Sequence, residues 1–369
     1  MTSRRPQSGT QGPSGPRQSG TQGPSGPRQS GVQRKPAFRV LAAPDKFRGT
    51  GTAREIAAAM SRGALAAGVE CDQCPLADGG EGILDALGGA NRSSLVTGPL
   101  GDAVTAPWRL SGGTAIIEMA AASGLSLLGG AAGNDPLAAS TTGTGELIAN
   151  AIDAGARRIV VGVGGSATTD GGFGALRAMY PLPRLRGIEI IVACDVRTTF
   201  VDAAPVFAPQ KGASPTQVTL LQRRLERLAQ VYRDEYGVDV SALPRSGAAG
   251  GLAGGLAAIG ATLVDGFALV ADEVGLAERM RGVDLVITGE GFLDEQSFEG
   301  KVVGGVVELA AHVGVPVLAV VGDVYDDADT RVETVALAAR FGREQALGDT
   351  LACVERAVSE WLRERRCSG

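Results

Sequence analysis

A glycine-dense segment at residues 157–172 constrains the fold more than any other part of the chain. It reads Arg-Arg-Ile-Val-Val-Gly-Val-Gly-Gly-Ser-Ala-Thr-Thr-Asp-Gly-Gly. The β-branched run predicts a strand, the glycines predict a turn, and residues 173–179 are compatible with a helix. This order of strand, glycine turn and helix directs free backbone N–H groups toward an anion. The segment therefore predicts a phosphate-binding loop.

The side chains of this loop also suit a phosphorylated ligand. Gly164 and Gly165 allow close approach of the main chain, and Ser166 and Thr168 add hydroxyl groups. Asp170 supplies a carboxylate that could hold Mg²⁺ or accept a proton. The competing interpretation is that Asp170 only caps the helix that follows.

Composition excludes several classes of function. The chain has 369 residues, of which 44% are hydrophobic, and is long enough for two domains. Its formal net charge of −5 gives no general attraction to nucleic acid or to an anionic membrane surface. Five cysteines, with no apolar leader and no apolar run that could span a bilayer, predict a cytoplasmic protein. We therefore expect a small-molecule partner.

Residues 1–36 are predicted to be a disordered basic tail. An eleven-residue unit occurs twice, at residues 8–18 and 19–29, and offers almost no apolar side chain to a core. A Gln-Ser step interrupts the Gly-X-Y period that a triple helix requires. We expect no role for this tail in the chemistry.

The first predicted βα unit ends in a charged loop. An apolar strand at residues 38–43 leads into Asp45, Lys46 and Arg48, and a helix follows. Ligands of open α/β sheets bind just beyond the carboxyl ends of strands, so these residues could hold a substrate carboxylate or phosphate. A solvated turn is an equally good interpretation of this loop alone.

A second unit repeats this design. A strand at residues 69–76 is followed by Asp78 and Glu81 in a glycine turn, ahead of another helix. Carboxylates in such a turn indicate metal or base chemistry, although acidic residues near a helix start also serve as ordinary caps. Short β-like pieces at residues 107–110 and 114–119 then indicate a second domain inserted into the first.

Charged residues also follow strands or glycine turns in the second half of the chain. Asp195 ends a strand at residues 187–194, and a buried strand at residues 283–288 leads to Asp294. Lys211 and Lys301 lie beside glycines and could neutralise a phosphoryl group, or could be plain surface lysines. The single histidine nearly excludes a histidine-based catalytic triad.

Seven strings of the chain together resemble the bacterial type I glycerate kinase family, and they occur in the family's order from residue 38 to the C-terminus. They are Ala-Pro-Asp-Lys-Phe-Arg-Gly, Ala-Asp-Gly-Gly-Glu-Gly, Thr-Thr-Gly-Thr-Gly-Glu, Gly-Gly-Ser-Ala-Thr-Thr-Asp-Gly-Gly, Pro-Gln-Lys-Gly-Ala, Gly-Ala-Ala-Gly-Gly-Leu and Ile-Thr-Gly-Glu-Gly-Phe-Leu-Asp. The chain departs from the family's usual residues at Lys46, Arg48, Phe292 and Glu299. Kinase chemistry is therefore better supported than the identity of the acceptor.

The resemblance implies an α/β fold in which both chain ends, residues 37–97 and 275–369, form a Rossmann-like parallel-sheet domain. A second α/β domain, residues 98–274, is inserted between them. The implied activity transfers the γ-phosphoryl group of ATP to D-glycerate, with Mg²⁺ as cofactor and 2-phosphoglycerate as the expected product. A homodimer is a possible assembly.

Phosphoryl transfer requires positioning, charge neutralisation and an acceptor for the hydroxyl proton. We assign triphosphate binding to the glycine loop, metal binding to a carboxylate, charge stabilisation to the two lysines and substrate binding to the first charged loop. The triphosphate is assigned to Gly164, Gly165, Ser166 and Thr168, and the metal to Asp78 or Asp170. Charge stabilisation is assigned to Lys211 and Lys301, and substrate binding to Asp45, Lys46 and Arg48. The base is Asp195 or Asp294.

Three other functions stay open from the sequence. Gly162, Gly164 and Ala167 fit a relaxed dinucleotide-binding fingerprint, which would indicate an oxidoreductase. The protein could instead be a kinase for a different small hydroxy acid. A kinase-like regulator without turnover is disfavoured because the aspartates of all five loops are retained.

Overall fold

Two β-sheets organise the structure, a computed structural model that describes residues 38–298, 300–325 and 332–367. The predicted tail at residues 1–36 lies outside the described residues. Both sheets belong to the unit formed by residues 37–369. Helices follow most of their strands along the chain, which confirms the predicted α/β class.

The first sheet has five parallel strands in the order β13-β11-β9-β1-β2. Their bounds are β1 (Arg39–Ala42), β2 (Glu70–Gln73), β9 (Leu285–Thr288), β11 (Val317–Val321) and β13 (Glu333–Ala336). Strand β1 lies between β2 and β9, so segments from both ends of the chain build one sheet, as the Rossmann-like expectation requires.

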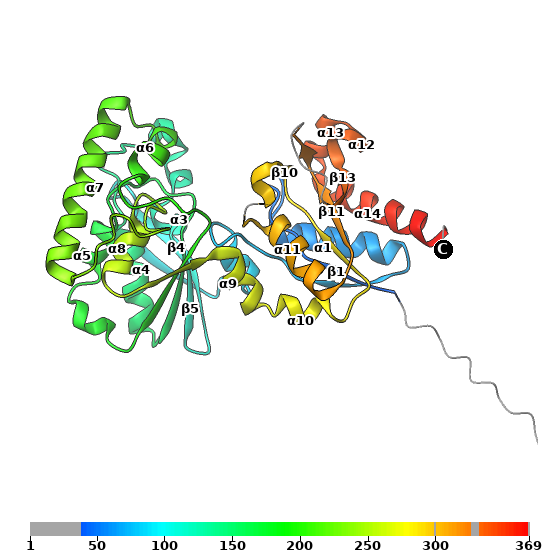
Figure 1. Cartoon of the computed structure of the whole chain (residues 1–369), viewed down its shortest axis with the longest axis horizontal. Helices are drawn as coiled ribbons and strands as arrows, with labels where there is room; N and C mark the ends of the chain where they lie inside the picture. Colours follow the sequence, from blue (N-terminus) through cyan, green and yellow to red (C-terminus); the bar gives the residue numbers. More distant parts are fainter. Residues whose placement is uncertain (1–37, 299, 326–331, 368–369) are drawn as a thin grey trace, which may run out of the picture. The chain divides into compact units, whose positions relative to one another are not determined.

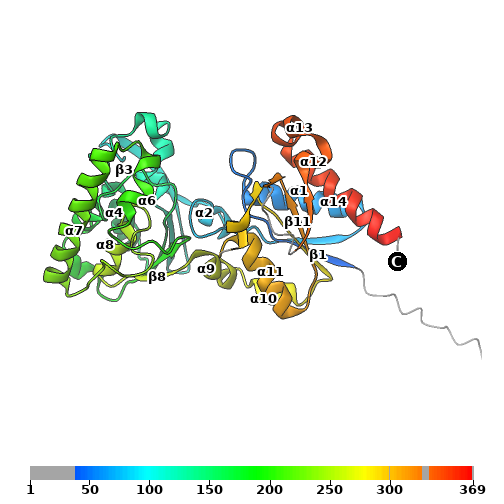
Figure 2. The same ribbon diagram turned by 45° about the horizontal axis from the view of Figure 1, so that its top comes forward.

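Helices cover both faces of this sheet. Since successive side chains of a strand point to opposite faces, neighbouring residues of β1 contact different helices. Val40 and Ala42 of β1 pack with α1 (Ala53–Ala66) and α14 (Thr350–Cys367), whereas Leu41 packs with α10 (Leu276–Met280) and α11 (Val302–Val313). Figure 2 shows α1 and α14 on one side of β1 and β11, with α10 and α11 on the other. The sequence of α1 begins with a Thr52–Glu55 capping box, which fixes its start just after the first charged loop.

The second sheet has six strands in the order β3-β4-β5-β6-β7-β8. Their bounds are β3 (Arg92–Thr97), β4 (Ala103–Ser111), β5 (Thr114–Glu118), β6 (Arg158–Gly162), β7 (Glu189–Cys194) and β8 (Thr262–Asp265). The first three strands pair antiparallel, and β5 to β8 pair parallel. Strand β3 belongs to this sheet, although the proposed boundary at residue 97 leaves it in the first domain. The domain limits otherwise stay a proposal.

One face of the second sheet carries the largest apolar core. Ile117, Ile159 and Val192 pack there with the helices α4 (Thr142–Asp153), α5 (Phe173–Ala178), α7 (Pro215–Tyr236) and α8 (Leu252–Ala258). Figure 1 shows these four helices grouped with β4 and β5. On the other face, Val160 and Ala193 share a core with Leu41 and with Phe267 of α9 (Gly266–Glu273). That core is continuous between the two sheets.

The remaining α-helices and β-strands of the described chain are short. They are α2 (Ile83–Ala86), α3 (Ala120–Ser123), α6 (Ala203–Phe207), α12 (Leu337–Phe341), α13 (Arg343–Gly348), β10 (Phe292–Leu293) and β12 (Asp323–Val324). Within the described ranges, no helix combines the length and the apolar character needed to cross a bilayer.

Candidate active site

A single cavity of about 450 Å³ brings together the charged loops of the first sheet and the glycine loop of the second. Eight of the residues predicted for the site line it: Lys46, Arg48, Asp78, Gly164, Gly165, Ser166, Asp195 and Lys211. Asp45 adjoins it through an ion pair with Lys46, whose Nζ lies 3.8 Å from the Asp45 carboxylate. The other predicted residues, Thr168, Asp170, Asp294 and Lys301, do not line this cavity.

Two glycine turns meet at the cavity with main chain against main chain. A Cβ on Gly164 would lie 2.9 Å from Cα of Gly80, and a Cβ on Gly79 would lie 2.3 Å from Cα of Gly266. Contacts that short leave no room for a side chain, so both turns require glycine. The close approach places Asp78 opposite the glycine loop.

The glycine loop presents unpaired donors to the cavity. Its edge is held by hydrogen bonds from Leu125 N to Gly165 O (2.8 Å) and from Ala167 N to Ser123 O (3.0 Å). In the described part of the chain, no protein acceptor pairs with the backbone N–H of Gly164, Gly165 or Ser166. Three free N–H groups beside a lysine form an anion-binding concavity.

Lys211 is buried beside this loop, with only 3% of its surface exposed. Its Nζ donates to Ser166 Oγ (2.8 Å) and to the carbonyl of Thr168 (2.6 Å). No carboxylate among the described residues forms an ion pair with it. Burial lowers the pKa of Lys211 to about 7, against the opposing charge of Asp170. The carbonyl of Thr168 anchors the lysine, whereas its hydroxyl is buried and has no hydrogen-bond partner among the described residues, so the predicted role of that hydroxyl stays a prediction.

Asn134 fixes this lysine and the glycine loop together. Its Nδ2 donates to Ala167 O (3.0 Å) and to Lys211 O (2.9 Å). Asn134 was not predicted as a site residue, because this residue lies in a stretch without strand or helix periodicity. Its only signal was its place between two apolar segments, which is too weak to indicate a site.

Carboxylates form the opposite wall of the cavity. Asp78 Oδ1 accepts from Gly80 N (3.1 Å) and lies 3.7 Å from Lys46 Nζ. Asp195 follows β7 and keeps exposed surface, but the protein crowded around it raises its pKa to about 6 by desolvation, with the Asp78 charge adding to the effect. A carboxyl with this pKa is poised to take a proton near neutral pH.

The donor set fits Mg²⁺ that arrives with a nucleotide better than a resident ion. The described residues contain no group of three His, Cys, Asp or Glu side chains placed to hold a metal. Mg²⁺ in phosphoryl-transfer sites typically uses one or two carboxylates together with phosphate oxygens. Asp78 and Asp195, which interact electrostatically, are the pair that could supply them.

Asp170 is committed to hydrogen bonds within the chain. Its Oδ2 accepts from Thr141 N (2.9 Å), Thr141 Oγ1 (2.8 Å) and Gly174 N (3.2 Å), and its Oδ1 accepts from Gly172 N (3.1 Å). These bonds tie the glycine loop to the starts of α4 and α5. The geometry favours the capping interpretation of Asp170 over the metal-ligand interpretation.

Asp170→Asn is expected to destabilise the protein by about 1–3 kcal/mol, because an amide NH₂ would face donors that now share a carboxylate. The Mg²⁺ concentration for half-maximal activity should stay unchanged at temperatures where the variant is folded. Urea unfolding and a Mg²⁺ titration measure the two quantities. A variant with parental stability and a raised Mg²⁺ requirement would restore Asp170 as a ligand.

A second group of charges lies at the ends of β1 and β9. Asp294 Oδ1 accepts from Ser297 N (2.8 Å) and lies 4.0 Å from Lys301 Nζ. Burial raises the pKa of Asp45 to about 6 and that of Glu290 to about 7. Glu290 was not predicted as a site residue, although a carboxylate directly after a buried strand was a usable signal.

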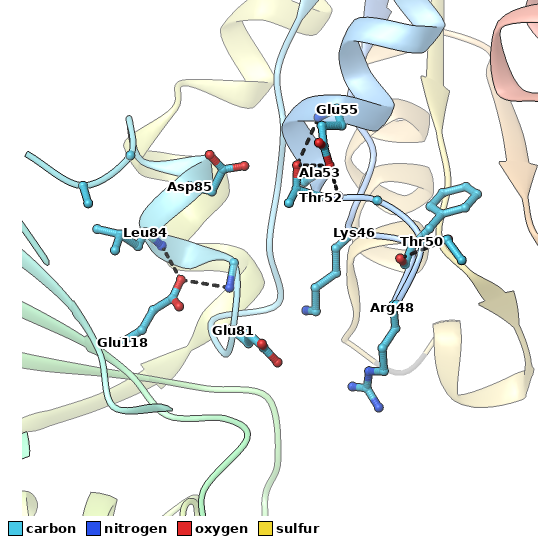
Figure 3. A pocket seen from close by; sticks show the side chains of 16 residues that line it. Lys46, Arg48, Thr50, Thr52, Ala53, Glu55, Glu81, Leu84, Asp85 and Glu118 are labelled. Atoms are coloured by element: carbon cyan, nitrogen blue, oxygen red, sulfur yellow. Dashed lines mark hydrogen bonds between the residues drawn. The ribbon is translucent and has the colours of Figure 1, made fainter. Parts of the chain in front are cut away.

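A neighbouring cavity of about 530 Å³ shares Lys46, Arg48 and Glu81 with the first. Figure 3 shows the Lys46 and Arg48 side chains extending from one loop into the space that Glu81 faces. Glu118 lies at its edge and accepts from the backbone N–H of Gly82 (2.9 Å) and Leu84 (2.8 Å). Four carboxylates also line this cavity, so Lys46 and Arg48 are the groups in it that could hold the carboxylate of an organic acid.

Comparisons with known proteins point to one family. A model described as the glycerate kinase family matches residues 40–180 and 181–364. A glycerate 2-kinase of Escherichia coli (strain K12) is 39% identical over 329 aligned residues, covering 78% of this chain and 86% of the relative. A glycerate kinase of Halalkalibacterium halodurans is 39% identical over 323 residues, covering 77% and 85%.

A solved structure gives the same result. The crystal structure of a protein described as glycerate kinase 2, from Salmonella typhimurium LT2, matches with a TM-score of 0.77 at 34% identity. The match covers 90% of this chain and 99% of that one. Since both the sequence and the fold agree over most of their length, the protein belongs to the glycerate kinase family and is a kinase.

Proposed function

We propose that the protein transfers the γ-phosphoryl group of ATP to D-glycerate and forms 2-phosphoglycerate. The observation that carries this proposal is the cavity in which Lys211 and three free N–H groups face the Lys46 and Arg48 loop. One side suits phosphates and the other suits a carboxylate. The relatives named as glycerate kinases indicate that the acceptor is glycerate.

Each group of residues in the cavity has its own role in phosphoryl transfer, which follows from its charge. The N–H groups of residues 164–166 bind phosphate oxygens, and Lys211 neutralises charge that develops on the transferred group. Lys46 and Arg48 hold the glycerate carboxylate and so orient its hydroxyl. Asp195 accepts the hydroxyl proton. Mg²⁺, held by Asp78 together with phosphate oxygens, would neutralise the triphosphate when bound, which leaves the Asp195 carboxylate free to act as the base.

The purified protein is expected to release ADP in a coupled assay that contains ATP, Mg²⁺ and D-glycerate, with turnover lost on addition of EDTA. The product should be identified as 2-phosphoglycerate rather than 3-phosphoglycerate by NMR. A panel of other small hydroxy acids serves as the comparison, because the charged loop departs from the family's usual residues. Faster turnover of another acid would move the proposal to that acceptor, and absence of ADP release with all of them would contradict it.

A further inference from the structure

A third cavity of about 910 Å³ opens next to the active site, and Asp195 is the one residue of its lining that has a role in the proposed phosphoryl transfer. It shares Asp195 and Val196 with the cavity of the glycine loop. That cavity in turn shares Lys46, Arg48 and Glu81 with the 530 Å³ cavity. The three spaces therefore follow one another, with the phosphate-binding loop in the middle.

One part of the wall of the third cavity is apolar and suits a flat, weakly polar group. Phe267 and Ala268 of α9 and Leu309 of α11 line it. A Cβ on Gly305 would lie 2.1 Å from the Phe267 ring, so α11 packs directly against this ring and holds it in place. A fixed aromatic ring with aliphatic neighbours is a common lining for ligand pockets.

Polar groups at the rim of this cavity can hold hydroxyl groups. Arg245 has a φ of 71°, which is uncommon for a residue other than glycine, and donates to Cys194 O (3.3 Å) and Asp265 Oδ2 (3.1 Å). The carboxylates of Asp272 and Glu308 also line the cavity and are exposed. Carboxylates accept hydrogen bonds from sugar hydroxyls, as they do in dinucleotide sites.

We propose that this third cavity binds the nucleoside part of the ATP donor, with the base against Phe267 and Leu309 and the sugar near the rim. The inference rests on the proposed ATP-dependent activity. In-line transfer places the nucleoside and the acceptor on opposite sides of the moving phosphate. Lys46 and Arg48 line both the phosphate cavity and the 530 Å³ cavity, but not the larger one. With the acceptor carboxylate held at these two cations, the larger cavity beyond Asp195 is left for the donor side.

Ala268→Trp tests this assignment, because Ala268 is exposed and its replacement fills the cavity without entering the core. Isothermal titration calorimetry with ADP should show affinity weakened at least tenfold, whereas inorganic tripolyphosphate, which lacks a nucleoside, should bind within twofold of the parent. Ala311→Trp is the matched control, an exposed alanine of α11 that does not line the cavity, and it should leave both affinities unchanged. Equal weakening of both ligands by Ala268→Trp, or no weakening of either, would overturn the proposal.

A second measurement needs no variant. Photolabelling of the unmodified protein with 8-azido-ADP should modify peptides of α9 or α11, and labelling confined to residues 47–55 would place the nucleoside in the other cavity. Formation of phosphoglycerate from ATP by the same protein tests the proposed function separately. A protein that turns over ATP but carries its label elsewhere would refute only the nucleoside site.

Discussion

Lys211→Met is expected to lower kcat/KM for ATP on the order of 10²–10³-fold, the usual effect of removing one donor to a developing oxyanion. The lysine is buried at the end of the free N–H groups, and its ammonium is the only cation on that side of the cavity among the described residues. Methionine fills a similar volume without the charge. The measurement is steady-state kinetics with varied ATP at saturating glycerate.

The loss of the Lys211 proton with rising pH gives a second way to test its role. Since burial lowers the Lys211 pKa to about 7, the ammonium loses its proton as the pH rises through 7, and kcat/KM for ATP should fall above that pH. The unfolded chain keeps the proton up to its ordinary lysine pKa, so this group should raise the free energy of unfolding between pH 7 and 10. Both trends should be missing in Lys211→Met.

Lys301→Met is the comparator, because Lys301 lies outside the phosphate cavity and 4.0 Å from Asp294. We expect its loss to cost much less activity than the loss of Lys211. Equal losses in the two variants, or an unchanged pH profile in Lys211→Met, would contradict the role given to the buried lysine.

Asp195→Asn is expected to lower kcat by about 10²–10⁴-fold, the range for removal of a general base. The carboxyl must be ionised to accept the proton, and desolvation raises its pKa to about 6. Activity of the parent should therefore rise with pH through about 6 and, with Lys211 titrating near 7, pass through a narrow optimum. A pH–rate profile of kcat/KM measures both limbs.

Asp294→Asn separates the two candidate bases. Asp294 already accepts from both the backbone N and the hydroxyl of Ser297 and lies outside the cavity, so its replacement should act mainly on stability. If Asp294→Asn removes activity while Asp195→Asn retains it, the base has been placed on the wrong residue.

The central strands could be predicted from the sequence, and three of the edge strands could not. Apolar runs at residues 38–43 and 283–288 became β1 and β9, whose neighbours bury them on both faces. Strands β3, β8 and β13 lie at sheet edges, and most of their residues are exposed or only half-buried. An edge strand needs fewer apolar residues, so its pattern is too weak to distinguish it from a loop.

The site was predictable to the extent that it depends on strand ends. Carboxyl ends of parallel strands share one edge of a sheet, which brought Lys46 and Asp78 correctly to one cavity. The burial of Lys211 depends on contacts between segments distant in sequence, which periodicity does not contain. The same limit applies to Asp170, whose partner Thr141 lies 29 positions earlier in the chain.

The position of β1 between β2 and β9 sets an order of events during synthesis. Arg39 and its partner Asp284 are 245 positions apart, and a ribosome that adds roughly 5–20 residues per second needs on the order of 12–50 s to span that gap. All six strands of the other sheet, residues 92–265, are translated within this interval. The earliest strand of the protein is therefore completed by one of its latest, and a nascent chain that stops before residue 285 carries β1 with one edge open.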